Sequence, residues 1–337
     1  MSGIPKNHHA NRQMEVWLNS LSGQISEALL TGRKFVRHHP FVSVRKVLFY
    51  GMGGSAIGGD VLRAVMTERS SVLFSVYRQG RWSRWVDEDT LVVFSSYSGD
   101  TWEMIDVLHK AVRSKARLLV VTSGGRLAEI AQAAGVPCLK IPSGMPPRCA
   151  LGYLTFSLLP VMEKVGGFKI PAGELKELLS TLKKAPKAFA KRLAAKLQNR
   201  ILHLYTVSGF MEPAAARWRA EIAENAKMLA SHHLLPEMFH NEIEGWQYPK
   251  WALKRSAAIF LTDKDDSPVL RRKIQAAMQL IRKAGALAVE VPSKGKSRLA
   301  RLFSLISAGD WTSYELALKN GADPVAIPAI SAIKKVS

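Results

Sequence analysis

Apolar residues along the chain follow two alternating patterns, one typical of buried strands and one typical of helices. Short β-rich runs at 47–50 and 91–94 each precede a glycine- or serine-rich turn, and a segment with helical periodicity follows. Further strand candidates lie at 72–77, 118–122 and 136–141. Strands that alternate with helices in this way predict a parallel sheet covered by helices on both faces.

The same pattern starts again in the second half of the chain, after glycines and prolines near 165–173. Before the first strand, a helix is expected at 14–37. In the second half, helices are expected at 173–197, 211–230, 269–284 and 297–318, and strands at 201–207, 257–261 and 286–291. We therefore predict an α/β protein with two tandem domains, 1–165 and 166–337, each a mostly parallel sheet flanked by helices.

Composition favours a globular, unexported protein. Hydrophobic residues make up 47% of the 337 residues, which is enough for a buried core. No apolar run reaches the roughly 18–20 residues of a bilayer span, and the N-terminus has no signal-peptide core, so we expect a cytoplasmic protein without a membrane partner. The two cysteines exclude a disulfide framework. Adjacent histidines such as His232 and His233 point apart, so no metal site is expected.

The net charge is +21, which admits three interpretations: a nucleic-acid surface, adaptation to the cell interior, or attraction of an anionic substrate. The basic residues are spread over several segments, and in 183–200 they alternate with apolar residues at helical spacing. That arrangement is typical of the solvated face of an amphipathic helix, so a nucleic-acid partner is not expected.

A glycine-rich turn, GMGGSAIGGD at 51–60, follows the first strand and opens a helix. Glycines allow the backbone to approach a ligand, and the helix N-terminus presents free amides to an anion. The spacing matches neither a dinucleotide fingerprint nor a phosphate loop with lysine. A plain strand-to-helix turn is the alternative interpretation.

A second turn, SSYSGDT at 95–101, also lies between a strand and a helix. Its hydroxyls at Ser96, Ser98 and Thr101 can bind one phosphate, although Ser98 or Thr101 alone can serve as a helix N-cap. Two hydroxyl-rich turns at the carboxyl ends of strands in one sheet favour a ligand site, because open α/β sheets bind ligands there.

Two further segments carry charged candidates. Arg148 lies between a diproline and an apolar helix start, and it is either an oxyanion-stabilising cation or a surface side chain. Arg217, Glu221 and Glu224 share a helix face. One interpretation is an ion pair on a solvated face. The other is that neighbouring residues hold a carboxylate as a base. A following loop can then return His240 to that carboxylate for acid–base catalysis.

Six segments in order resemble the bifunctional phosphoglucose/phosphomannose isomerase family, within the sugar-isomerase (SIS) domain superfamily. They are GMGGSAIGGD, SSYSGDT, PPRCALGY, RWRAEIAENAK, PEMFHNEIEGW and YELALKNGADPVAIPAISAIKK. The resemblance covers the chain from about residue 47 to the C-terminus and implies two tandem SIS-type domains.

By this resemblance, Gly54 and Ser55 lie in the first ligand-binding turn, and Ser96, Ser98 and Thr101 match the phosphate-binding hydroxyls. The second turn departs from the family pattern Ser-Gly-Asn-Thr-Glu, because it reads Ser-Gly-Asp-Thr-Trp. The resulting carboxylate, Asp100, is expected to point away from the phosphate or to be paired.

The resemblance also implies catalytic roles. Arg148 matches the arginine that steadies the enediolate, Glu224 the base that carries the proton between C1 and C2, and His240 the group that assists ring opening. Lys334 matches the family's C-terminal lysine, although the adjacent Lys335 leaves the register open by one.

The implied activity is isomerisation of glucose 6-phosphate, mannose 6-phosphate or both to fructose 6-phosphate through a cis-enediol. The family is metal-independent and dimeric, with the site completed across subunits, so neither a cofactor nor a metal is expected. A non-catalytic sugar-phosphate regulator and another SIS-fold isomerase are the alternatives. The presence of Glu224 and His240 favours the enzyme.

Overall fold

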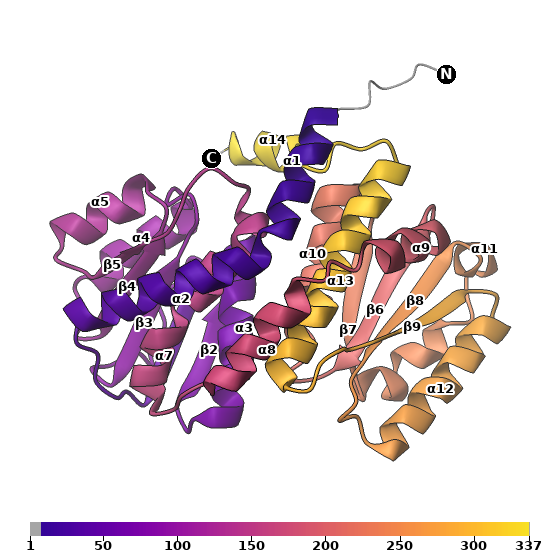
Figure 1. The fold of residues 1–337 in the computed structure, drawn as a ribbon, viewed down its shortest axis with the longest axis horizontal. Helices are drawn as coiled ribbons and strands as arrows, with labels where there is room; N and C mark the ends of the chain where they lie inside the picture. Colours follow the sequence, from indigo (N-terminus) through magenta and orange to yellow (C-terminus); the bar gives the residue numbers. More distant parts are fainter. Residues whose placement is uncertain (1–7, 337) are drawn as a thin grey trace. The chain divides into compact units, whose positions relative to one another are not determined.

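The computed structural model describes residues 8–336, which form two compact units (Figure 1). The N-terminal unit is Ser20–Leu179, and the C-terminal unit combines residues 8–19 with residues 180–336. None of the helices within 8–336 combines the length and the apolar character needed to cross a membrane.

The N-terminal unit contains one parallel sheet of five strands, in the order β2-β1-β3-β4-β5. Its elements are α2 (Leu21–His38), β1 (Lys46–Gly51), α3 (Gly53–Arg69), β2 (Leu73–Tyr77), β3 (Thr90–Ser95), α4 (Trp102–Ala111), β4 (Arg117–Thr122), α5 (Gly125–Ala133), β5 (Cys138–Lys140), η1 (Pro147–Ala150), α6 (Leu151–Phe156) and α7 (Leu159–Gly166). Helix α8 (Ala172–Leu182) spans the border to the C-terminal unit.

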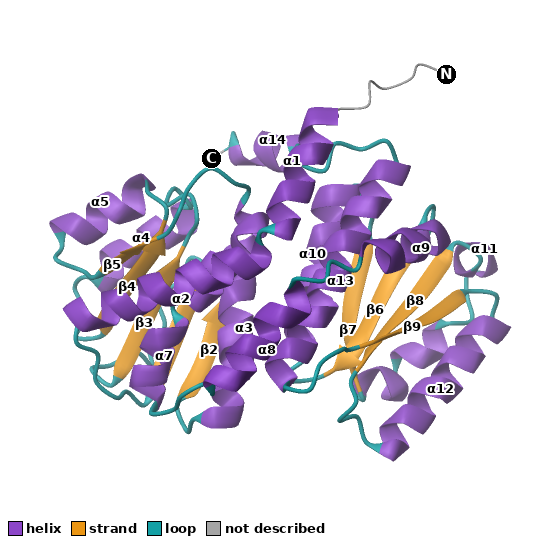
Figure 2. Cartoon of the chain, in the orientation of Figure 1, coloured by secondary structure: helices purple, strands orange, loops and turns teal. Residues whose placement is uncertain are grey.

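Helices cover both faces of this sheet (Figure 2). Leu48 and Tyr50 of β1 are fully buried and pack in one cluster with residues of α4 and α5. Phe49 points to the other face, as alternation along a strand requires. A Cβ atom at Gly59 of α3 would lie 2.5 Å from the Phe49 ring, so α3 approaches the sheet closely because position 59 has no side chain.

The C-terminal unit contains a second parallel sheet, with four strands in the order β7-β6-β8-β9. Its elements are α1 (His8–Asn19), α9 (Lys187–Leu197), β6 (Ile201–Val207), α10 (Glu212–Glu221), the π-helical turn η2 (Ile222–Ala226), β7 (Ala230–Leu235), η3 (Glu237–His240), η4 (Glu242–Gly245), α11 (Lys250–Leu253), β8 (Ser256–Thr262), α12 (Pro268–Lys283), β9 (Leu287–Pro292), α13 (Arg298–Lys319) and α14 (Pro328–Lys334).

Aromatic side chains pack on one face of this second sheet and between two of its helices. Tyr205 and Phe260 stack at 4.9 Å between ring centroids, in a core that includes α12. On the other side, α10 and α13 lie side by side (Figure 1), and the fully buried Trp218 donates a hydrogen bond to Leu305 O at 2.7 Å. Gly309 makes this packing possible, since its Cβ would lie 2.3 Å from the Trp218 ring.

The predicted fold class, two α/β units with parallel sheets, is confirmed. Three details of the prediction are wrong. The single helix expected at 14–37 is two helices, α1 and α2, and the one expected at 173–197 is α8 and α9, where Pro186 stands at the N-cap of α9. The helix expected at 211–230 ends near Ala226, and an unpredicted strand, β7, begins at Ala230.

Candidate active site

The two turns singled out in the sequence lie next to each other in the N-terminal unit. In the sheet, β1 lies between the next two strands of the chain, with β2 on one side and β3 on the other. This is the point where the strand order reverses, and such points bind ligands in open α/β sheets. The last residues of the two strands are paired, Gly51 with Ser95, so the turns at 51–55 and 95–101 begin side by side.

Hydrogen bonds join the two turns through their hydroxyl groups. Ser55 Oγ accepts a hydrogen bond from the Tyr97 amide at 3.2 Å, and Ser96 Oγ lies 2.8 Å from Thr101 Oγ1. Ser96 Oγ also accepts from the Gly99 amide at 3.2 Å. Thr101 stands at the N-cap of α4, but its side chain makes no capping hydrogen bond. Its hydroxyl therefore faces Ser96 instead of capping the helix.

Ser98 and Asp100 occupy the exposed part of the second turn. Ser98 Oγ accepts from the Asp100 amide at 3.3 Å, a local turn interaction. The Asp100 carboxylate accepts a hydrogen bond from the Arg126 amide at 3.1 Å, in the first turn of α5. Of the two expectations, that Asp100 points away from the phosphate or is paired, this hydrogen bond agrees with pairing, here with a backbone amide at the start of α5.

Arg148 approaches the glycine-rich turn from a third segment, η1. A Cβ atom at Gly54 would lie 3.0 Å from both Arg148 N and Pro147 O, so the close approach of this backbone depends on glycine. Met145 N, just before η1, donates to the Tyr97 hydroxyl at 3.2 Å. Arg148 is only 3% exposed, so the interpretation as a surface side chain is wrong. The segment 145–148 thus brings the backbone of a buried arginine against the first turn and the Met145 amide against the second.

In the C-terminal unit, the charged face of α10 is buried and not solvated. Arg217 forms two hydrogen bonds with Asp310, at 2.8 and 3.0 Å, and an ion pair with Glu221 at 3.0 Å. All three side chains are less than 5% exposed. Burial raises the pKa of Asp310, and the Arg217 charge opposes that shift. The expected ion pair on a solvated face is therefore wrong: the network holds α10 against α13.

Glu224 lies beyond this network, in the π-helical turn η2, where it is half-buried. Such turns occur frequently at functional sites. Lys227 ends the turn with a left-handed backbone (φ 57°), and its Nζ donates to the carbonyl groups of Glu224 and Asn225. The same Nζ donates to two carbonyl groups of the segment before α14, at 2.8 and 2.7 Å. Lys227 therefore fixes the position of the turn that carries Glu224. The sequence pattern does not reveal this role.

His240 lies at the opposite edge of the same sheet. It is exposed in η3, just after the carboxyl end of β7, whereas η2 precedes the amino end of that strand. The strand has six residues, so its length separates the two regions by about 20 Å at about 3.3 Å per residue. The prediction that a loop returns His240 to Glu224 is wrong, because β7 carries the chain across the sheet.

The predicted residues thus form two sets. Gly54, Ser55, Ser96, Ser98, Thr101 and Arg148 come together in the N-terminal unit. Glu224, His240 and Lys334 belong to the C-terminal unit, and Lys334 is exposed in the last turn of α14, with Lys335 next to it.

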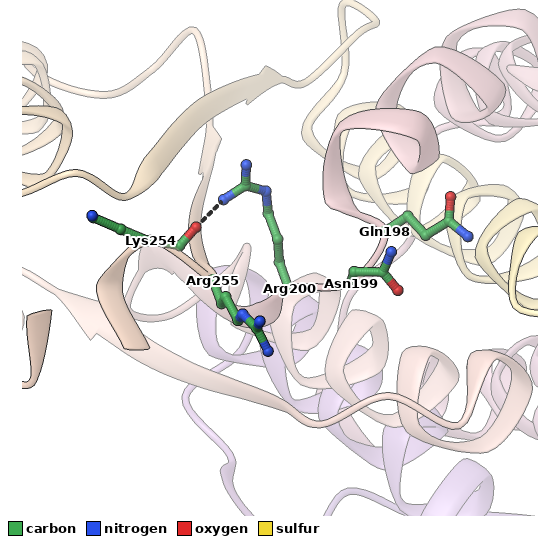
Figure 3. Close-up of a pocket in the computed structure, with 5 residues that line it drawn as sticks. All are labelled: Gln198, Asn199, Arg200, Lys254 and Arg255. Carbon is green, nitrogen blue, oxygen red and sulfur yellow. Dashed lines mark hydrogen bonds between the residues drawn. The ribbon is translucent and has the colours of Figure 1, made fainter. Parts of the chain in front are cut away.

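An open basic hollow of about 610 Å³ lies elsewhere in the C-terminal unit (Figure 3). It is lined by Gln198, Asn199, Arg200, Lys254 and Arg255, none of which was predicted as a site residue. Arg200 donates to Lys254 O at 3.0 Å and to Ser256 O at 3.3 Å. Its guanidinium therefore joins the starts of β6 and β8.

Comparison with known proteins matches the two units to two domain families. Residues 41–144 match the SIS domain, and residues 187–336 match the bacterial phospho-glucose isomerase C-terminal SIS domain. A bifunctional phosphoglucose/phosphomannose isomerase of Caldicellulosiruptor bescii is 34% identical over 325 residues, which cover 94% of this chain and 96% of that protein. The chain belongs to the bifunctional phosphoglucose/phosphomannose isomerase family.

The chain is also similar to one protein with a different named activity and to one solved structure. A D-glucosamine-6-phosphate 4-epimerase of Sulfolobus acidocaldarius is 31% identical over 203 residues, covering 60% of this chain and 64% of that protein. A crystal structure of a hypothetical protein from Thermus thermophilus covers 97% of this chain and 92% of that chain, with a TM-score of 0.77 and 17% identity. The latter similarity shows a shared fold only. Family membership makes the chain a sugar-phosphate isomerase by type.

Proposed function

We propose that this protein interconverts glucose 6-phosphate, mannose 6-phosphate or both with fructose 6-phosphate, through a cis-enediol intermediate. One observation carries the proposal beyond family membership: two hydroxyl-lined turns meet at the strand-order reversal of the first sheet, joined by the Tyr97–Ser55 hydrogen bond. A site of hydroxyl groups and helix amides suits a phosphate that must be released after each turnover. Because phosphorylated hexoses are charged and do not cross membranes freely, we expect the protein to act in the cytoplasm.

The residues of the N-terminal unit bind the substrate in this proposal. Ser96, Ser98 and Thr101 bind the phosphate, and Gly54 with Ser55 allows close approach of the substrate to the first turn. Arg148 has a fixed positive charge and is 3% exposed, so it can stabilise the negative oxygen of the enediolate where water has little access. These roles fall in the predicted domain 1–165.

The residues of the predicted domain 166–337 transfer protons. His240 and Lys334 assist opening of the sugar ring. Glu224 then removes the proton from C2 of the aldose and returns it to C1, while the oxygen at C1 receives a proton and that at C2 loses one. The net change is a hydrogen shift within the substrate, so no redox cofactor takes part.

We further propose that the protein acts as a homodimer with shared active sites. Glu224 and His240 lie beyond opposite ends of β7, whose six residues span about 20 Å. Both must act on carbons and oxygens of a single sugar, which is far smaller than that span. The arrangement therefore favours a site in which these two residues come from different subunits.

The decisive experiment follows the C2 proton in deuterated solvent with either aldose phosphate. The wild-type protein is expected to exchange that proton and form fructose 6-phosphate, and Glu224→Gln should lose about 10²–10⁴-fold in rate. Sugar-phosphate binding without exchange would instead establish a non-catalytic regulator. Conversion of glucosamine 6-phosphate at C4, with no exchange at C2 of the hexose phosphates, would establish an epimerase like the Sulfolobus relative.

A further inference from the structure

Three potential metal ligands meet on one face of the second sheet. None of them is among the residues assigned to catalysis. His203 of β6, His233 of β7 and Glu242 of η4 each offer one ligand atom, and these atoms lie within 4.8 Å of one another. The sequence pattern does not predict this group, because its members are 30 and nine residues apart and belong to different elements. Strand pairing brings them together: His203 lies beside Ser231, and Tyr205 lies beside His233.

Neighbouring groups already orient two of these three side chains. Ser231 Oγ lies 3.0 Å from His203 Nδ1, which leaves the other ring nitrogen of His203 for a ligand bond. The Tyr205 hydroxyl donates to one oxygen of Glu242 at 2.6 Å, and Trp246 donates to the same hydroxyl at 3.1 Å. Metal-binding histidines and carboxylates are typically held by such second partners, which set their orientation.

The distances also suit a small divalent ion. His233 Nδ1 lies 3.0 Å from the second oxygen of Glu242. Two ligands of a tetrahedral zinc ion, each about 2.0–2.1 Å from the metal, are about 3.3 Å apart. The His233–Glu242 separation is therefore near that value, and His203 would have to move closer by about 1.5 Å at most, which is within the reach of side-chain rotation.

The group is open to solvent on one side. A cavity of about 290 Å³ is lined by His203, Glu242, Trp246, Tyr248 and other residues of the 242–256 segment. The side chain of Glu242 is 27% exposed and that of His233 is 42% exposed. An ion held here by three protein ligands would keep a fourth position open to water, as is typical of three-ligand zinc sites.

We propose that His203, His233 and Glu242 bind one divalent transition-metal ion, with Zn²⁺ as the best match to two imidazoles and a carboxylate. The site goes beyond the proposed isomerase function and does not depend on it. It lies directly after His240, since Glu242 is two residues further along the chain. Bound metal should hold η4 to strands β6 and β7 and so raise the Tm of the protein.

The test uses full-length protein without an affinity tag, stripped with EDTA and dialysed. Zn²⁺ is titrated by calorimetry, and Co²⁺ by its visible absorption, which reports coordination by nitrogen and oxygen. Co²⁺ should also quench the fluorescence of Trp246, whose ring lies 5.1 Å from that of His203, and Trp246→Phe should remove that part of the quenching. One ion per chain is expected.

Variants locate the ion. His203→Gln and His233→Gln should each weaken binding by about 100-fold or more, and Ser231→Ala by about tenfold. The control is His232→Gln, because neighbouring strand residues face opposite sides of the sheet and this change should leave affinity within about threefold. Tm and circular dichroism of the metal-free variants check folding. If His233→Gln does not fold, His203→Gln still decides the question.

Two results would overturn the proposal. One is the absence of stoichiometric binding of Zn²⁺ and Co²⁺ to the wild-type protein. The other is binding that His203→Gln leaves unchanged, or that His232→Gln weakens equally, which would place the ion elsewhere. The group would then be a hydrogen-bonding network that anchors η4. Isomerase activity is measured separately and does not affect either conclusion.

Discussion

A mixed dimer of two inactive variants tests the position of His240 relative to Glu224 most directly. Glu224→Gln removes the proposed base, and His240→Asn removes the proposed ring-opening group. Strand β7, which is about 20 Å long, lies between the two residues in one chain. If the active site is shared, a dimer with one copy of each variant has one site with both defects and one site with none.

The expected magnitude follows from this arrangement. Each homodimer of a single variant should retain at most about one hundredth of wild-type activity, given the usual contribution of acid–base catalysis. The purified mixed dimer should recover about half of the wild-type rate per dimer, because symmetry gives one intact site out of two. That recovery exceeds the activity of either parent by about 50-fold.

The assay uses co-expression with two different tags, tandem purification of the mixed dimer, and coupled detection of fructose 6-phosphate. The control is a mixed dimer of Ser96→Ala and Thr101→Val. Their hydroxyls lie 2.8 Å apart in one turn, so every site in that dimer keeps one defect and no recovery is expected. Activity of the first mixed dimer no higher than the average of its parents would refute the shared site.

Three further predictions concern single substitutions. Gly99 has φ +79°, and Gly99→Ala places a Cβ 1.9 Å from the main-chain oxygen of Gly124, so this change should raise the KM for hexose 6-phosphate by about tenfold in steady-state kinetics. Gly135→Ala is the control, because it adds similar backbone strain of about 1–2 kcal/mol without a clash and should leave KM unchanged. Lys227→Met frees the turn that carries Glu224 and should lower kcat by about 10²-fold with little change in KM; an unchanged kcat would exclude this positioning role. Burial acts to raise the pKa of Asp263, but hydrogen bonds from Arg301 and Ser293 lower that pKa overall. The ionised Asp263 therefore stabilises the fold above its ordinary pKa of 3.8, and this stabilisation is lost as the pH falls through the lower pKa of the folded state. The Tm of Asp263→Asn should therefore fall less steeply than that of the wild type between pH 5 and about pH 2, and parallel curves would contradict the assignment.

The sequence alone is sufficient to predict the parallel sheets and the two turns of the proposed substrate site. Strands such as β1 and β3 are buried on both faces, so they appear as continuous apolar runs bounded by glycine or serine. The hydroxyls of Ser96 and Thr101 belong to the same turn, so their proximity follows from a few neighbouring residues. Family resemblance then supplied roles for residues that spacing alone left open.

Only the tertiary structure decided where the charged residues lie. Strand β7 is partly exposed along most of its length and carries His232 and His233, so it has no apolar signal. A sequence interpretation that lacks this strand therefore places His240 too close to Glu224. The burial of Arg217 likewise depends on Asp310, 93 residues away. A turn depends on residues close in sequence. The edge of the sheet at which a side chain lies depends instead on how distant strands and helices pack, and so does the charge that lies next to it.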